Sequence, residues 1–227
     1  MRERHATPTE DRRNSAGGTA FADLRRFVGR TPAPVERCDL CSAALGPEHR
    51  HLLEPTGGKL LCACGACSVL FGGQGGTKYK LIPRRVRTLP HFQMSDAEWS
   101  ALLLPINMAF FVHSTPRGRV MAIYPSPAGP TESLLSLEAW SEIVAQNEAL
   151  GTLESDVEAL LVNRLGAMRG FAVPEYYIVP IDVCYNLVGL IRGQWRGLSG
   201  GGEVWSEMSR FFEDLKRRAT PSEASHA

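Results

Sequence analysis

Apolar runs and turn residues predict a group of β-strands in the second half of the chain. Met108–His113 and Arg119–Tyr124 are rich in Phe, Val, Ile and Tyr, and Ser114–Gly118 between them supplies turn residues. We therefore expect these residues to form a β-hairpin. Val157–Asn163 and Tyr176–Val179 are two more apolar runs, and each predicts a further strand.

Apolar residues at helical spacing predict helices around these strands. Ser95 and Ser136 are suited to cap the first two helices, and the proline and glycine residues of Pro125–Pro130 predict a loop. The four predicted helices are Asp96–Leu104, Leu137–Leu150, Ile181–Trp195 and Gly202–Arg217. The side chains that the last of them is expected to bury are Val204, Met208, Phe211 and Leu215.

This order of elements favours an α+β fold, in which helices pack on a small antiparallel or mixed sheet. We expect a four-cysteine module like a zinc ribbon to precede that sheet. Residues 20–28 predict a short helix, whereas the residues before them lack apolar periodicity. The predicted organisation is a disordered tail (residues 1–18), a helix plus the metal ribbon (19–76), the α+β domain (77–218) and a second disordered tail (219–227).

Composition and charge narrow the classes of partner. The 25 Lys and Arg residues nearly balance the 24 Asp and Glu residues, so no overall field draws the chain to nucleic acid. The basic stretch Lys78–Arg87 is the one local candidate for phosphate contacts. The longest apolar stretch, Ala101–Val112, is too short to span a membrane. Arg12 and Arg13 are not followed by an apolar export segment, so we expect a cytoplasmic protein.

The cysteine spacing carries the strongest chemical signal. Five of the six cysteines lie within residues 38–67, and without a secretory signal such clustering favours metal binding over disulfides. Two C-x₂-C knuckles occur in this segment, and each turns two thiolates toward one point, so that two facing knuckles complete a tetrahedron. We therefore predict that one metal ion is bound by Cys38, Cys41, Cys64 and Cys67.

Three neighbouring residues leave alternatives open. Cys62 could pair with Cys67 in place of Cys64, but the C-x₄-C spacing matches a knuckle less well, so we interpret Cys62 as a spare thiol. His49 and His51 could each replace a thiolate. We expect these histidines to be solvated or to donate hydrogen bonds near the ligands.

Spacing alone does not separate zinc from iron, because four thiolates in a tetrahedron suit both ions. The rubredoxin pattern carries glycine after the second cysteine of each knuckle, where this chain has Ser42 and Ser68. This departure favours zinc in a structural role and makes iron the alternative.

No catalytic signature accompanies the cysteines, so we do not expect an enzyme. Asp156, Glu158 and Asp182 could act as acids or bases, but no histidine or nucleophile stands in a recognised pattern with them. Cys184 lies on the apolar stripe of a predicted helix and is interpreted as an inert core thiol.

Several segments of the chain are together similar to one family: Cys38–Cys41, Glu48–Leu53, Leu61–Cys67, Tyr124–Leu135, Tyr176–Tyr185 and Gly197–Gly201. They resemble a bacterial family of unknown function that is associated with gene clusters for oxygen-tolerant uptake nickel-iron hydrogenases. The resemblance covers most of the chain. It implies an accessory role near a redox enzyme, with hydrogenase subunits or maturation proteins as partners.

The leading hypothesis is therefore a non-catalytic metal-binding accessory or assembly protein that serves a nickel-iron hydrogenase. The alternative is a rubredoxin-like iron electron carrier for the same enzyme. A zinc-ribbon regulator that binds nucleic acid through Lys78–Arg87 is the third and weakest hypothesis.

Overall fold

The structure is a computed structural model, and it describes residues 35–73, 78–133, 137–166, 173–197 and 199–221. The chain divides into two compact units, residues 1–36 and 37–227, and every element below belongs to the second unit. The expected tail at residues 1–18 and the expected helix at 20–28 lie outside the described residues.

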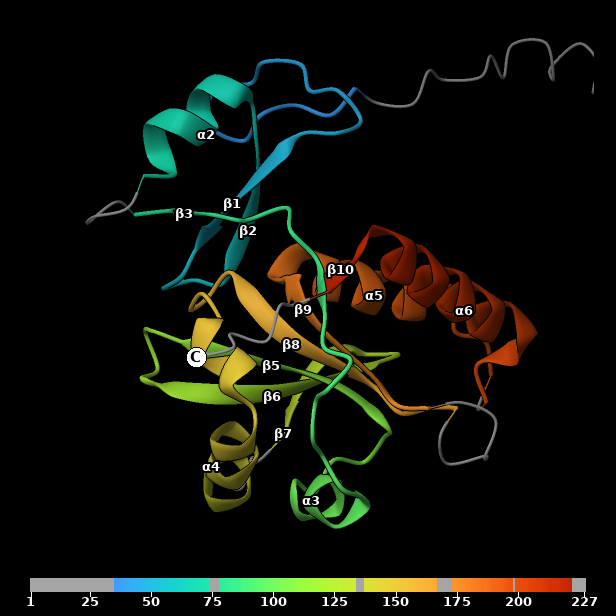
Figure 1. The fold of residues 1–227 in the computed structure, drawn as a ribbon. Helices are drawn as coiled ribbons and strands as arrows, with labels where there is room; N and C mark the ends of the chain where they lie inside the picture. The colour runs from blue at the N-terminus through green and yellow to red at the C-terminus, as the bar shows by residue number, and fades with distance from the viewer. Residues whose placement is uncertain (1–34, 74–77, 134–136, 167–172, 198, 222–227) are drawn as a thin grey trace, which may run out of the picture. The chain divides into compact units, whose positions relative to one another are not determined.

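A seven-stranded sheet forms the largest part of the second unit (Figure 1). Its strand order is β10-β4-β9-β8-β5-β6-β7, and all neighbours are antiparallel except β10 and β4. Both edge strands contain a proline, Pro130 in β7 and Pro221 in β10. The strands are β4 (Arg87–Thr88), β5 (Met108–Ser114), β6 (Arg119–Ser126), β7 (Gly129–Ser133), β8 (Glu158–Asn163), β9 (Glu175–Pro180) and β10 (Thr220–Pro221).

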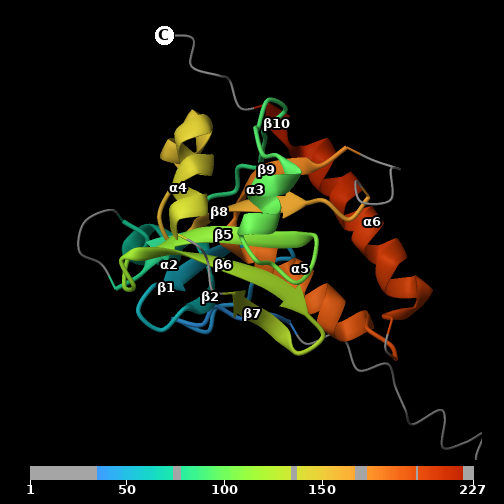
Figure 2. The same cartoon turned by 90° about the horizontal axis from the view of Figure 1, so that it is seen from below.

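Helices cover both faces of this sheet, because its central strands are apolar on both sides. Consecutive residues of β5, Phe110 and Phe111, pack into different clusters: Phe110 packs with α5 and α6, and Phe111 packs with α3 and α4. Figure 2 shows α3 in front of the sheet when the molecule is seen from below. The helices are α3 (Asp96–Ala101), α4 (Leu137–Gln146), the 3₁₀ helix η1 (Glu148–Thr152), α5 (Ile181–Gln194) and α6 (Gly201–Arg218).

The α+β class is confirmed, and so are the predicted hairpin, the last two predicted strands and all four predicted helices. The sheet is larger than predicted, partly because the expected loop at Pro125–Pro130 is wrong. Strand β6 continues to Ser126 and β7 begins at Gly129, with Pro125 opposite Pro130 in the register. Proline is tolerated there because it lies near the sheet edge, where a missing N–H donor costs little.

Two predicted helices end earlier than expected. Helix α4 ends at Gln146 because the side-chain amide of the next residue, Asn147, donates to the carbonyls of Ile143 and Gln93, at 2.8 Å each. Helix α3 begins with the expected cap at Ser95 but ends at Ala101. In α6 the buried phenylalanine is Phe212 and not the predicted Phe211, which is half-buried.

A three-stranded antiparallel sheet with the order β2-β1-β3 precedes the large sheet in the chain. In its register His51 lies opposite Cys62, and Leu52 lies opposite Leu61. Its elements are β1 (Arg50–Glu54), β2 (Lys59–Ala63), the helix α2 (Gly65–Phe71) and β3 (Lys80–Leu81).

The expected domain boundaries remain a proposal. Strand β3 follows the boundary after residue 76, yet it pairs with β1, which precedes that boundary. Thr220 and Pro221 fall within the expected tail 219–227, and they pair with β4. Residues 222–227 lie outside the described residues.

A buried carboxylate joins the small sheet to the large one. The ammonium of Lys80, in β3, lies 2.6 Å from Asp156, whose side chain is 4% exposed. The backbone N–H and the hydroxyl of Thr115 also donate to Asp156, at 2.7 and 2.6 Å. Burial by itself raises the pKa of the Asp156 carboxyl, but Lys80 and Thr115 outweigh burial and hold this pKa below its usual range.

This contact predicts a loss of stability in acid. The folded state holds the pKa of Asp156 below the value of about 3.9 expected for the unfolded chain. The unfolded state therefore binds more protons, and the contribution of Asp156 to stability falls as the pH falls through its folded pKa. Urea denaturation between about pH 6 and pH 3 should show a shallower pH dependence for Asp156→Asn than for the wild type. Parallel curves would contradict this expectation.

Candidate metal centre

The first knuckle is a tight turn closed by backbone hydrogen bonds. The N–H of Ser42 donates to the carbonyl of Cys38, and the N–H of Cys38 donates to Ala43, each at 2.8 Å. Cys38 is buried, whereas Cys41 is exposed. The turn places Ser42 in the left-handed region, with φ of 62°.

The second knuckle lies at the start of helix α2. Cys64 is the N-cap of this helix, and its Sγ accepts a hydrogen bond from the backbone N–H of Cys67 at 3.4 Å. Both cysteines are thus held in the first turn of α2, an element that the sequence analysis did not predict. Asp39 holds the first knuckle against β2 through two hydrogen bonds. The backbone N–H of Asp39 donates to the carbonyl of Cys62 at 2.9 Å, and the carboxylate of Asp39 accepts from the backbone N–H of Cys62 at 2.6 Å.

These two turns bring four thiols together. The Sγ atoms of Cys38, Cys41, Cys64 and Cys67 all lie within 4.8 Å of one another. The Sγ atoms of Cys41 and Cys64 are 3.7 Å apart. A zinc ion with Zn–S distances of about 2.3 Å would need sulfurs about 3.8 Å apart in a tetrahedron. The four cysteines therefore have the chemistry and the spacing for one tetrahedral ion.

The backbone around the cluster favours a thiolate at one of its members. Burial raises the pKa of the Cys38 thiol, but hydrogen bonds from the backbone of Cys64, Leu40 and Cys41 outweigh it and lower this pKa to about 6. Burial, followed by hydrogen bonds with the other thiols, raises the pKa of Cys67 to about 12. Thiolates this close repel one another, and a bound cation would stabilise them together.

Ser42 supplies a prediction about the first knuckle. A residue with a Cβ at φ of 62° carries a steric cost that glycine avoids. We expect Ser42→Gly to stabilise the metal-loaded protein by about 1 kcal/mol against urea denaturation. Ser68→Gly is the matched control, because Ser68 lies inside α2 and donates to the carbonyl of Gly65 at 2.8 Å. The control should destabilise the protein by about 1 kcal/mol, and equal effects of both changes would contradict the expectation.

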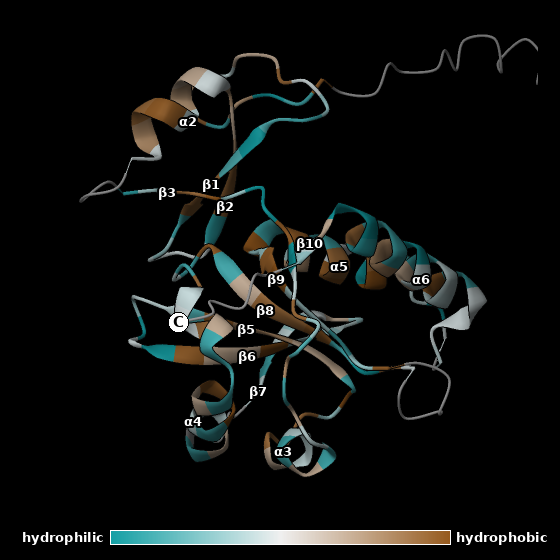
Figure 3. Ribbon diagram, viewed as in Figure 1, coloured by the Kyte–Doolittle hydropathy of each residue, from teal (hydrophilic) through white to brown (hydrophobic). Residues whose placement is uncertain are grey.

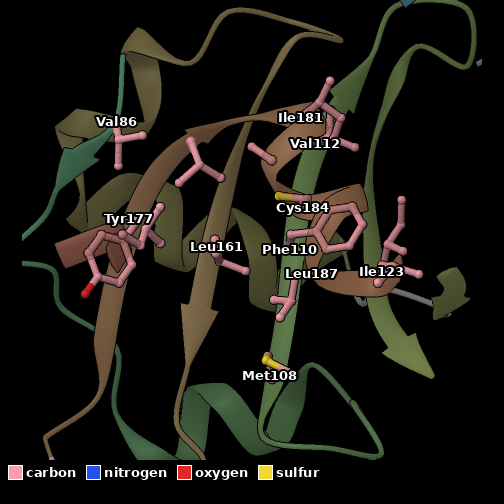
Figure 4. Close-up of a cluster of buried hydrophobic side chains, with 14 of the residues drawn as sticks. Val86, Met108, Phe110, Val112, Ile123, Leu161, Tyr177, Ile181, Cys184 and Leu187 are labelled. Carbon is pink, nitrogen blue, oxygen red and sulfur yellow. The ribbon is translucent and has the colours of Figure 1, made fainter. Parts of the chain in front are cut away.

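The remaining thiols and imidazoles lie elsewhere. Cys62 groups with His49 and His51, whose ligating atoms lie within 4.8 Å of one another, and none of the three belongs to the four-cysteine cluster. Residue spacing along the chain did not indicate this second group. Cys184 is fully buried on α5, where Figure 4 shows it in the core near Phe110 and Leu187. Burial raises the pKa of the Cys184 thiol, in agreement with an inert core residue.

The candidate acids form ion pairs within the chain. Asp156 pairs with Lys80, and Glu158, whose side chain is fully buried, pairs with Arg85 at 2.7 Å and Arg87 at 3.2 Å. Two other members of the basic stretch also have partners, because Lys78 pairs with Glu54 and Arg84 donates to the carbonyl of His49. The basic stretch therefore contacts the rest of the chain through its side chains.

Among the described residues no helix is both long and apolar enough to cross a membrane.

Comparisons with known proteins identify the family of this chain and do not indicate an activity. Neither a curated protein nor a solved structure matches the chain. Residues 37–219, which include both knuckles and the large sheet, match the profile of a family of unknown function. This match covers most of the sequence, and the chain therefore belongs to the family of unknown function DUF5947.

Proposed function

We propose that this protein is a non-catalytic metal-binding accessory or assembly protein of the cytoplasm, in which four cysteines hold one zinc ion. The observation that carries the proposal is the convergence of the Sγ atoms of Cys38, Cys41, Cys64 and Cys67 within 4.8 Å. An ion bound by four thiolates keeps no open coordination position, so it stabilises the segment and does not activate water.

The serines after the knuckles support zinc over iron. Ser42 and Ser68 replace the glycines that let backbone N–H groups approach the sulfurs of a rubredoxin-like iron site. The exposure of Cys41 favours the second candidate, an iron electron carrier, because an exposed ligand gives electrons a short path to a partner. Metal analysis after anaerobic expression with iron decides between them. A colourless protein that contains zinc is expected, and a coloured iron protein would overturn the zinc proposal.

Removing the ion should unfold one part of the chain before the rest. The segment Cys38–Cys67 has a small buried cluster, whereas Met108–Leu215 supplies most of the apolar core of the large sheet. After chelation, we expect hydrogen exchange to lose protection in Cys38–Cys67 first. Loss of protection throughout Met108–Leu215 at the same time would contradict a local structural role for the ion.

An apolar surface beside the four cysteines supports a protein partner. Val69, Leu70 and Phe71 at the end of α2 are 79%, 71% and 41% exposed, and much of α2 is brown in Figure 3. Exposed apolar residues grouped in this way are common where another protein binds. The resemblance described above implies that the partner is a nickel-iron hydrogenase subunit or one of its maturation proteins.

Co-purification from the native host tests this partner. Tagged wild-type protein should recover a hydrogenase subunit or maturation protein, and Leu70→Glu should recover much less because the charge would enter the apolar surface. Leu103→Glu is the control, since Leu103 is 75% exposed and lies after α3, outside the four-cysteine segment. If neither preparation recovers such a protein, the hydrogenase part of the proposal is wrong.

A further inference from the structure

A second group of metal-binding side chains lies on the other face of the β1–β2 hairpin. His51 and Cys62 are direct cross-strand partners, so their side chains lie on the same face. Their neighbours Leu52 and Leu61 point the other way and pack with Cys38 and Cys67. His49 precedes β1 by one residue, and its ligating atoms lie within 4.8 Å of those of His51 and Cys62.

The hydrogen bonds of the two imidazoles define which ring nitrogens carry protons. The Nδ1 of His51 lies 2.7 Å from a carboxylate oxygen of Asp182, and the Nδ1 of His49 lies 3.0 Å from the carbonyl oxygen of Gly46. Both of these oxygens only accept hydrogen bonds, so each Nδ1 is the donor. In the neutral form of each ring, the Nε2 atom therefore presents a lone pair.

These two lone pairs face each other. The Nε2 atoms of His49 and His51 are 3.1 Å apart. Two acceptors at this distance repel each other unless a proton or a metal ion lies between them. An ion with tetrahedral Zn–N distances of about 2.0–2.1 Å would need nitrogens about 3.3 Å apart. The observed separation is close to that value, and the thiol of Cys62 is near enough to supply a third ligand.

We propose that His49, His51 and Cys62 form a second metal site, which takes a divalent first-row transition ion such as Zn²⁺. Asp182 is a positioning residue, because its carboxylate holds the Nδ1–H of His51 and directs Nε2 to the ion. Two imidazoles and one thiolate suit zinc and the neighbouring ions of the first transition row. This site goes beyond the four-cysteine ion and shares none of its ligands.

The second site differs chemically from the first because it has only three protein ligands. Both His49 and His51 line a cavity of about 430 Å³, which Asp182 also borders. A three-ligand ion keeps a coordination position for water or another exchangeable ligand, and the cavity gives that ligand room. The four-cysteine site has no such position. The chain would thus carry one closed site and one open site on the two faces of the same hairpin.

Metal titration of the full-length protein tests the proposal. After metal removal under reducing conditions, the wild type should bind two Zn²⁺ or two Co²⁺ ions per chain. His51→Ala and Cys62→Ala should bind one, and the ion that they keep should be the one at the four-cysteine site. His113→Ala is the matched control, since His113 is exposed on β5, and it should bind two. Co²⁺ at the second site has one thiolate ligand. The sulfur charge-transfer absorption that comes from this site should be lost in Cys62→Ala, whereas the absorption from the four-cysteine site should remain.

Several results would separate a failure here from a failure of the four-cysteine proposal. A wild type that binds one ion, which Cys41→Ser loses, overturns the second site alone. Retention of two ions in both His51→Ala and His49→Ala overturns it as well. Asp182→Asn should lower the metal affinity of the second site by about 10- to 100-fold and leave the affinity of the four-cysteine site unchanged. Because the four-cysteine ion reports that the segment is folded, loss of both ions in Asp182→Asn would mean that Asp182 is only structural.

Discussion

Serine at any one of Cys38, Cys41, Cys64 and Cys67 is expected to abolish tight metal binding at the four-cysteine site and to unfold the segment around it. Three thiolates leave the shell incomplete, and structural zinc sites contribute about 10 kcal/mol or more to the folding of such segments. Metal analysis of the purified variants measures the loss, and hydrogen exchange over residues 38–67 measures the unfolding. No other single change in this segment is expected to have so large an effect.

Two other cysteines provide the controls for this experiment. Cys184→Ser should keep the four-cysteine ion, because Cys184 lies in the core of the large sheet. Cys62→Ser should keep it too, because Cys62 groups with the histidines. Loss of this ion in Cys62→Ser together with its retention in Cys64→Ser would show that Cys62, and not Cys64, completes the second knuckle.

The second large effect is expected at a buried carboxylate. Glu158 is fully buried, and its two oxygens accept hydrogen bonds from Arg85 at 2.7 Å and Arg87 at 3.2 Å. The Arg87 side chain is only 17% exposed, so Glu158→Ala would leave a guanidinium largely buried without its counter-charge. Breaking a buried ion pair in this way costs about 3–5 kcal/mol. Urea denaturation at neutral pH should show this loss.

The chain offers a matched comparison for Glu158. Glu132 also bonds two arginines, Arg117 at 2.8 Å and Arg119 at 2.7 Å, but its side chain is 32% exposed. Exposed ion pairs contribute about 1 kcal/mol or less, so Glu132→Ala should have a small effect. If the two changes cost the same, burial is not what gives the Glu158 pairs their importance.

The elements that sequence analysis predicted are those with long apolar patterns. The pattern of Met108–His113 extends over a whole strand, and that of Ile181–Trp195 over several helical turns, so each was visible without tertiary information. The two-residue strands β4 and β10 have no pattern of their own, and they form only because β9 and Val86 supply hydrogen-bond partners. Tertiary pairing of this kind explains why the observed sheet is larger than the predicted one.

The two clusters of candidate ligands also differ in how far local sequence patterns could predict them. The four cysteines were proposed from spacing because each knuckle is a local turn, and the structure places all four together. The group of His49, His51 and Cys62 depends on the β1–β2 register and on Asp182, which is 131 residues from His51 in the sequence. Neither a register nor so distant a contact can be read from local spacing.

The prolines at the two edges of the large sheet have a consequence for self-association. An unprotected edge strand offers a row of N–H and C=O groups to the edge of another copy, which is a common start of aggregation. Pro130 interrupts that row in β7, and in β10 Pro221 is one of only two residues. Within the residues that the structure describes, neither edge strand therefore offers an unbroken row of hydrogen-bonding groups to another molecule. The large sheet is therefore expected to resist edge-to-edge association at high protein concentration even where no other element covers its edge strands.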